Sequence, residues 1–196
     1  CQRLALVGSG GLGPELSAGL RAATLPGAEL VVTALAGVSG PLRFGFQMIE
    51  KVGRTAGWQR VGDLAEAGNA LFALKDAEAR RAFLRTLRGV VDGRGQAVTA
   101  LDRLYLADSI PMLVVWGSGD PIVPAQHAET VRELVPSARV EVFAGAGHWP
   151  HLDEPDRFCD VLLDFMATTE PASHDLDSWR RLLSQQKEGV AKPVGR

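Results

Sequence analysis

An aspartate and a histidine each stand just after a strand-like apolar run, where an acid and a base could meet. Met112 to Val115 is a continuous apolar run that ends near Gly117, and Asp120 follows it. Val140 to Phe143 is a second strand candidate, and His148 follows the small loop after it. Because ligands bind at the carboxyl ends of the strands in open α/β sheets, we expect both side chains at one functional edge.

The pair suits acid-base catalysis. A buried carboxylate that accepts the Nδ1 proton of an imidazole fixes its tautomer and stabilises the imidazolium formed when Nε2 takes a proton from a nucleophile. Asp120 would therefore orient the ring and His148 would be the base. Either residue alone is a weak signal, because Asp-Pro commonly opens a turn. Their separation (148 − 120 = 28 residues) leaves room for one helix and one strand.

The two motifs together resemble the α/β-hydrolase family, in which nucleophile, acid and histidine follow one another in that order. The matching residues are Trp116-Gly-Ser-Gly-Asp120-Pro-Ile-Val-Pro124 and Gly145-Ala-Gly-His148-Trp-Pro-His-Leu-Asp-Glu-Pro155, with Phe158. The resemblance implies an α/β fold: the C-terminal part of an α/β-hydrolase parallel sheet with an inserted, mainly helical cap. It also implies that Asp120 and His148 are catalytic, in a hydrolase acting on an ester-like or related small apolar substrate.

The same resemblance divides the chain into three parts. Residues 1–13 and 108–167 would form a partial hydrolase core, 14–107 the helical cap and 168–196 a polar tail. Arg3 to Val7 reads as a buried strand. In the tail, a short amphipathic segment is expected from apolar residues at Leu176, Trp179, Leu182 and Leu183.

Three helices are predicted from apolar spacing. The first spans Asp76 to Val91, with Asp76 as its cap and four arginines on its solvated faces. The second follows Pro124, and the third begins at Pro155 and packs on the sheet. Their expected apolar faces are Phe83, Leu87, Val90 and Val91; Val131, Leu134 and Val135; and Phe158, Val161, Leu162 and Phe165.

The nucleophile of such a hydrolase is missing from this sequence. A serine nucleophile sits in a G-x-S-x-G turn ahead of the acid and histidine, and no serine here has glycine at both −2 and +2. No aspartate occupies such a turn either. We therefore expect the missing N-terminal half of the same fold to be a partner of this chain, which alone would lack nucleophilic catalysis.

Two alternatives belong to other classes. Gly8, Gly10 and Gly13 form a G-x-G-x-x-G after a strand, which could bind a dinucleotide in an NAD(P)-dependent oxidoreductase. That fold requires a helix near Glu15 to Ala23, a strand near Leu30 to Thr33 and an acid at its end, yet Ala34 and Leu35 follow. A strand-to-cap connection is the preferred interpretation. The second alternative is a noncatalytic ligand-binding protein on the hydrolase scaffold.

Composition narrows the partners. A net charge of −2 over 196 residues gives no reason to expect nucleic acid or an anionic membrane, so a small-molecule substrate fits better. With two cysteines and no apolar run long enough to span a bilayer, a cytoplasmic protein is expected. No cofactor or metal is expected, because His148 and His151 lack a third ligand pattern. His127 is expected on the surface or at a helix start.

Overall fold

A computed structural model describes residues 1–56, 61–107, 109–173, 175–178 and 180. Most of the amphipathic segment expected in the tail, including Trp179, Leu182 and Leu183, lies outside these residues. Of that segment, Leu176 is described and is exposed.

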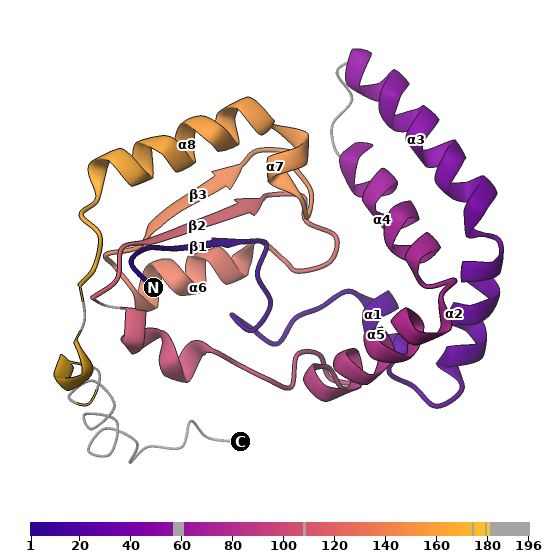
Figure 1. Cartoon of the computed structure of the whole chain (residues 1–196), viewed down its shortest axis with the longest axis horizontal. Coiled ribbons are helices and arrows are strands. Elements are labelled where there is room, and N and C mark those ends of the chain that lie inside the picture. Colours follow the sequence, from indigo (N-terminus) through magenta and orange to yellow (C-terminus); the bar gives the residue numbers. More distant parts are fainter. Residues whose placement is uncertain (57–60, 108, 174, 179, 181–196) are drawn as a thin grey trace.

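A three-stranded parallel sheet forms the centre of the fold (Figure 1). Its strands are β1 (Leu4–Val7), β2 (Met112–Gly117) and β3 (Arg139–Phe143), in the order β1-β2-β3. Leu4 is in register with Met112, and Leu113 with Arg139. Because all three strands run the same way, the loops after Val7, Gly117 and Phe143 emerge at one edge.

The central strand β2 is buried along its whole length, as its apolar run predicts. Met112, Val114 and Trp116 face one side of the sheet, where α6 (Gln126–Leu134) covers them. Leu113 and Val115 face the other side, in a cluster completed by residues of α8 (Pro155–Thr168). Figure 1 shows these two helices on opposite faces of the sheet. A short helix, α7 (Pro150–Asp153), precedes α8.

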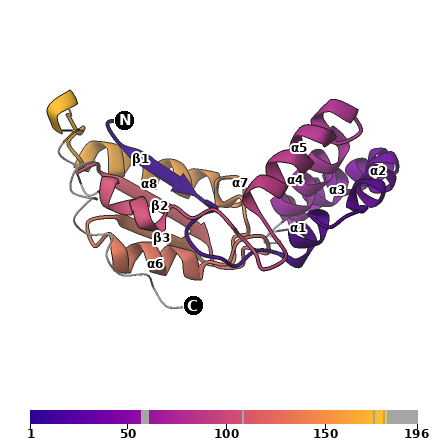
Figure 2. The same cartoon turned by 90° about the horizontal axis from the view of Figure 1, so that it is seen from below.

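Between β1 and β2 the chain leaves the sheet and forms a group of helices, here called the helical segment, residues 18–90. It lies to one side of the sheet in both views (Figure 2). Its helices are α1 (Ala18–Ala23), α2 (Ala28–Gly37), α3 (Ser39–Thr55), α4 (Val61–Ala73) and α5 (Ala77–Val90), and a 3-10 turn (Leu101–Ala107) leads back to β2. The predicted α/β class with added helices is confirmed.

The chain leaves and re-enters the sheet region at neighbouring points. The Gln96 amide donates to the Pro14 carbonyl at 2.8 Å, and the Gln96 side chain accepts from the Gly11 amide at 2.5 Å. The Ala100 amide donates to the Gly11 carbonyl at 2.8 Å. These bonds join the outgoing and returning segments at a position between the sheet and the helical segment.

The predicted helix starts are confirmed, but two buried faces differ from prediction. Asp76 caps α5, accepting from the Ala79 amide at 2.8 Å. Val90 is exposed, because the buried stripe runs through Leu84 and Leu87. On α6, Val131 and Val135 are buried with Ala128. Leu134 lies about 120° around that helix from Ala128 and is exposed.

The strand predicted for dinucleotide binding is absent from the described residues. Leu30 to Thr33 belongs to helix α2 and not to a strand, so β1 is not followed by the expected βαβ unit. The helix expected near Glu15 to Ala23 is present as α1, but it begins at Ala18, five residues after Gly13. The three glycines therefore need another explanation, which the site supplies.

Candidate active site

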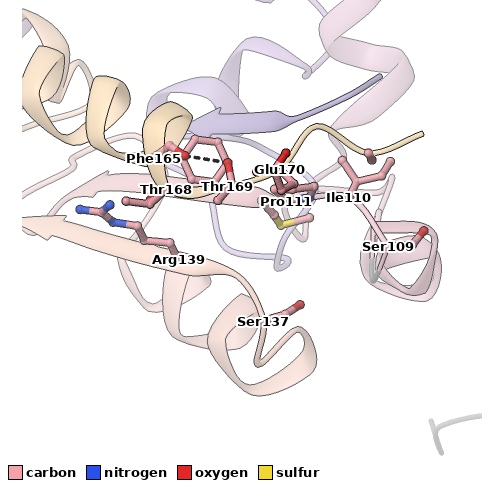
Figure 3. Close-up of a pocket in the computed structure, with 11 residues that line it drawn as sticks. Ser109, Ile110, Pro111, Ser137, Arg139, Phe165, Thr168, Thr169 and Glu170 are labelled. Atoms are coloured by element: carbon pink, nitrogen blue, oxygen red, sulfur yellow. Dashed lines mark hydrogen bonds between the residues drawn. The ribbon is translucent and has the colours of Figure 1, made fainter. Parts of the chain in front are cut away.

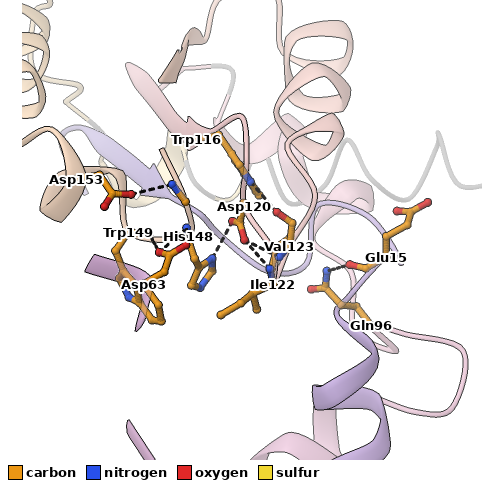
Figure 4. Close-up of polar contacts among 11 residues, drawn as sticks. Glu15, Asp63, Gln96, Trp116, Asp120, Ile122, Val123, His148, Trp149 and Asp153 are labelled. Atoms are coloured by element: carbon orange, nitrogen blue, oxygen red, sulfur yellow. Dashed lines mark hydrogen bonds and ion pairs between the residues drawn. The ribbon is translucent and has the colours of Figure 1, made fainter. Parts of the chain in front are cut away.

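The structure brings Asp120 and His148 together at the carboxyl edge of the sheet (Figure 4). The Nδ1 atom of His148 lies 2.8 Å from Oδ2 of Asp120. The other oxygen, Oδ1, accepts the backbone amides of Ile122 at 2.8 Å and Val123 at 2.9 Å. The Asp120 side chain is 0% exposed. Three donors thus hold a fully buried carboxylate in one orientation against the imidazole.

This contact assigns the two ring nitrogens of His148. An ionised carboxylate can only accept, so in a neutral imidazole at this position Nδ1 carries the proton and Nε2 presents a lone pair. The His148 side chain is 19% exposed, and none of the described residues hydrogen-bonds to Nε2. A neutral imidazole held in this way can take a proton at Nε2 while the carboxylate stabilises the resulting charge.

Several contacts hold the loop that carries Asp120. The Trp116 indole donates to the Val123 carbonyl at 3.0 Å, which closes the loop over the end of β2. The Ser118 hydroxyl accepts from the Gly145 amide at 2.8 Å and so ties this loop to the one bearing His148. A Cβ on Gly117 would overlap the Gly147 carbonyl oxygen. The two loops therefore pack backbone to backbone.

The loop that carries His148 needs its two glycines for different reasons. Gly145 has φ of 80°, a left-handed conformation that glycine adopts at no steric cost. Gly147 needs space: a Cβ there would overlap the carboxylate of Asp63. The Gly147 amide donates to Asp153 at 2.8 Å.

Asp63, from the first turn of α4, reaches this loop from the helical segment. Its Oδ1 accepts the His148 amide at 2.9 Å and the Trp149 amide at 3.4 Å, as Figure 4 shows. Asp63 is 8% exposed. Burial, opposed in part by these amides, raises the pKa of the Asp63 carboxyl above its usual value.

The glycine motif after β1 packs against the same region. Gly8 has φ of 53°, and a Cβ there would lie 2.9 Å from the carbonyl oxygen of His148 and 3.2 Å from its Nδ1. A Cβ on Gly10 would lie 2.8 Å from the Gln96 side chain, and one on Gly13 would overlap Nε2 of His127. Close approach to these side chains explains the three glycines without a dinucleotide.

His127 is buried, so its predicted surface position is wrong, although it does lie at a helix start. Its Nε2 is 2.8 Å from Oε2 of Glu15, and its ring meets Trp116 edge-on with centroids 6.1 Å apart. The hydrogen bond with His127 is the main cause that lowers the pKa of the Glu15 carboxyl. This pair lies against Trp116, whose indole holds the Asp120 loop.

The remaining polar side chains singled out from the sequence lie apart from this pair. The His151 ring packs at a tilt of 55° against Phe158, with ring centroids 5.6 Å apart. In the described part of the chain no three His, Cys, Asp or Glu side chains gather as metal ligands. Cys1 and Cys159 are exposed free thiols. None of the described helices has the length and apolar content to cross a bilayer.

A cavity of about 470 Å³ opens at the opposite edge of the sheet (Figure 3). It is lined by the first residues of two strands, Met112 and Arg139, and by Phe165, Thr168 and Thr169 at the end of α8. The Arg139 guanidinium is paired with Glu141 and Asp164. This cavity is therefore separate from the Asp120–His148 pair.

Sequence reasoning missed Asp63 and Ser118. Ser118 lies inside the motif that carries Asp120, but it was considered only as a nucleophile. Asp63 could not be predicted from the sequence, because it accepts the backbone amide of His148, 85 residues away. A backbone amide is present whatever the residue type, so this contact leaves no pattern in the sequence.

The sequence is similar to those of known proteins. A family model described as alpha/beta hydrolase fold matches residues 15–155. An uncharacterized protein of Mycobacterium tuberculosis is 41% identical over 185 residues, which cover 92% of this chain and 53% of the relative. The 2-hydroxymuconate semialdehyde hydrolase of Pseudomonas putida is 33% identical over 58 residues, covering 30% of this chain and 21% of that protein. The chain thus spans about half the length of the first of these relatives.

Structural comparison agrees on the fold. The 2-hydroxy-6-oxo-6-phenylhexa-2,4-dienoate hydrolase from Rhodococcus sp. strain RHA1 superposes with a TM-score of 0.55 at 20% identity, covering 85% of this chain and 56% of that one. The esterase RhEst1 from Rhodococcus sp. ECU1013 gives 0.50 at 20% identity, with the same coverage of 85% and 56%. At this identity the likeness concerns the fold alone. With the family match over most of its length, the chain belongs to the α/β hydrolase fold family.

Proposed function

We propose that the whole protein is a hydrolase that acts on an ester-like or related small apolar substrate through a nucleophile–His148–Asp120 triad. The observation that carries this proposal is the 2.8 Å contact between His148 Nδ1 and the fully buried Asp120 carboxylate. That contact leaves Nε2 as the basic atom at the edge of the sheet where ligands bind in this class of fold.

In the proposed reaction with a serine nucleophile, Nε2 of His148 takes the proton of the hydroxyl as its oxygen attacks the substrate carbonyl. Asp120 stabilises the imidazolium through Nδ1, and His148 then returns the proton to the leaving group. The helical segment, within residues 14–107, would form a cap beside this edge. Two of the structural neighbours are an esterase and a 2-hydroxy-6-oxo-6-phenylhexa-2,4-dienoate hydrolase, and their names suggest the two substrates to test.

We place the nucleophile in a part of the protein outside these 196 residues. The proposal rests on the sequence, in which no serine or aspartate occupies a glycine-flanked nucleophile turn. Translation of the coding DNA upstream of Cys1 tests it directly. A G-x-S-x-G or G-x-D-x-G turn there would identify the nucleophile and its class; an upstream reading frame without either turn contradicts the proposal.

Replacing the base should abolish turnover in the whole protein. We expect His148→Ala to lower kcat by several orders of magnitude and Asp120→Asn by about 10⁴-fold, because the asparagine selects the wrong tautomer. Initial rates on an aryl ester and on a 2-hydroxy-6-oxo-dienoate measure both effects. Circular dichroism checks that the variants are folded.

The matched control is His151→Ala, which removes an imidazole three residues away that contacts Phe158 and not Asp120. It should retain activity. Activity close to wild type in His148→Ala would remove this residue from the mechanism. Saturable binding of both substrates without turnover in the wild-type whole protein would instead favour the noncatalytic scaffold.

A further inference from the structure

The backbone of the loop carrying His148 is held from two sides. Sheet-side contacts hold its beginning: Gly145 donates to Ser118, and Gly147 to Asp153. The amides of His148 and Trp149 instead donate to Asp63, which comes from α4 in the helical segment. The residue proposed as base is therefore positioned by a part of the chain remote from the sheet.

Asp63 fits this loop closely. Its carboxylate is largely buried and accepts the His148 amide through both oxygens, at 2.9 Å and 3.2 Å. The same carboxylate occupies the space that a side chain at residue 147 would need. Gly147 is not among the glycines with positive φ, so its backbone conformation does not require glycine. The close contact with Asp63 does, because it leaves no room for a side chain.

We propose that Asp63 is a positioning residue that sets the orientation of His148 by holding its backbone from the helical segment. Asp120 then holds the ring of His148, and Asp63 holds its backbone. The reacting geometry would then exist only while α4 is docked beside α7. This inference rests on the proposed function for its catalytic consequence, but not for the contact itself.

The catalytic consequence is tested by three variants of the whole protein. Asp63→Ala should lower kcat about 10- to 100-fold with a smaller change in KM, because a shift of about 1 Å in a catalytic group costs that much. Asp63→Asn should restore most of the loss, since its Oδ1 can still accept both amides. Glu66→Ala, on the same helix but away from the loop, is the charge-matched control and should behave as wild type.

The contact is tested without activity by a double-mutant cycle in thermal stability. Gly147→Ala should lower the melting temperature, because the new methyl overlaps the Asp63 carboxylate. The same change in an Asp63→Ala background should cost clearly less, since the nearest obstructing atoms all belong to Asp63. In parallel, NMR should show faster exchange of the His148 and Trp149 amides in Asp63→Ala.

The outcomes separate the two proposals. If His148→Ala is inactive while Asp63→Ala keeps the wild-type kcat and amide exchange, the positioning role is wrong and the proposed function stands. If the whole protein hydrolyses neither substrate but the stability cycle and amide exchange respond as expected, the proposed function fails and the loop contact stands. Additive stability effects of the two substitutions would overturn the contact.

Discussion

At the scale of single residues, two carboxylates serve the same histidine in different ways. Asp120 is fully buried and receives three donors, one of them the His148 ring. Asp63 accepts only backbone amides among the described residues, and burial raises its pKa. In the proposed reaction Asp120 would stabilise the charge on the ring, whereas Asp63 accepts from neutral backbone amides.

The raised pKa of Asp63 predicts a pH-dependent effect of Asp63→Asn on stability. An acid whose pKa is raised by folding binds protons more tightly in the folded state. The free energy of unfolding therefore falls as pH rises from about 3.9 through the folded pKa. The uncharged asparagine avoids this loss. The melting temperature of Asp63→Asn relative to wild type should therefore increase between about pH 4 and pH 7.

Thermal denaturation at both pH values provides the check. A difference between variant and wild type that stays constant, or that falls toward pH 7, contradicts the assignment of burial as the main cause of the raised pKa. Because asparagine retains the amide-accepting oxygen, loss of the hydrogen bonds does not confuse the comparison.

Asp120 and His148 could be located from the sequence because each stands in a local motif after an apolar run. His127 was misplaced because a lone histidine near a helix start is usually exposed, and its burial depends on Glu15 and Trp116, which are remote in sequence. Asp63 could not be found, since its contact joins α4 to a loop through backbone atoms. Motifs reveal side-chain chemistry, and tertiary contacts decide which other residues support it.

At the scale of elements, the strands and the two helices that cover the sheet follow from apolar runs and spacing, although β1, which was predicted as buried, is only partly buried. The run at β2 predicts a strand buried on both faces, and the stripe Phe158, Val161, Leu162 and Phe165 predicts the buried side of α8; both are confirmed. Leu30 to Thr33 was misassigned because a four-residue apolar run fits a strand or a helix equally well. The longer periodic stretches left no such ambiguity.

The packing of α8 predicts a large contrast between two substitutions on that helix. Phe165 is 2% exposed and belongs to the cluster of Leu113, Val115 and Phe143. Phe165→Ala should reduce the free energy of unfolding by about 3–5 kcal/mol, because it leaves a cavity against the sheet. Leu163, on the same helix, is 63% exposed, and Leu163→Ala should cost less than about 0.5 kcal/mol.

Denaturant unfolding of the whole protein measures both changes under the same conditions. Similar losses for the two variants would mean that α8 does not pack on the sheet through the stripe containing Phe165. A loss confined to Phe165→Ala supports the packing that holds the loop of His148 between β3 and α8.

At the scale of the whole molecule, burial is unevenly distributed. Every residue of β2 is buried, while the described part of the helical segment leaves many large apolar side chains exposed. Ten of these lie between residues 25 and 52: Leu25, Leu30, Val31, Leu35, Val38, Leu42, Phe44, Met48, Ile49 and Val52. Both clusters of buried apolar side chains are built around the sheet.

This distribution predicts a gradient of hydrogen-exchange protection. Amides of β2, α6 and α8 should exchange slowest, near the rate set by global unfolding, while those of α2 and α3 should open more readily because fewer buried apolar contacts hold them. Exchange followed by mass spectrometry on the whole protein measures this. Equal protection in α3 and β2 would show that the helical segment unfolds only together with the sheet.

The bonds that join Gln96 to Pro14 and Gly11 also bear on the order of folding. Pairing of β2 with β3 has only α6 to span, whereas pairing of β1 with β2 must bring together strands separated by the entire helical segment. The entropy lost in closing a loop rises with its length, so β1 should join the sheet last. Once Gln96 and Pro14 are bonded, however, the loop left to close is short, whatever the intervening helices do. Folding can thus begin with the pairing of β2 and β3, and the bonds of Gln96 then allow β1 to join the sheet.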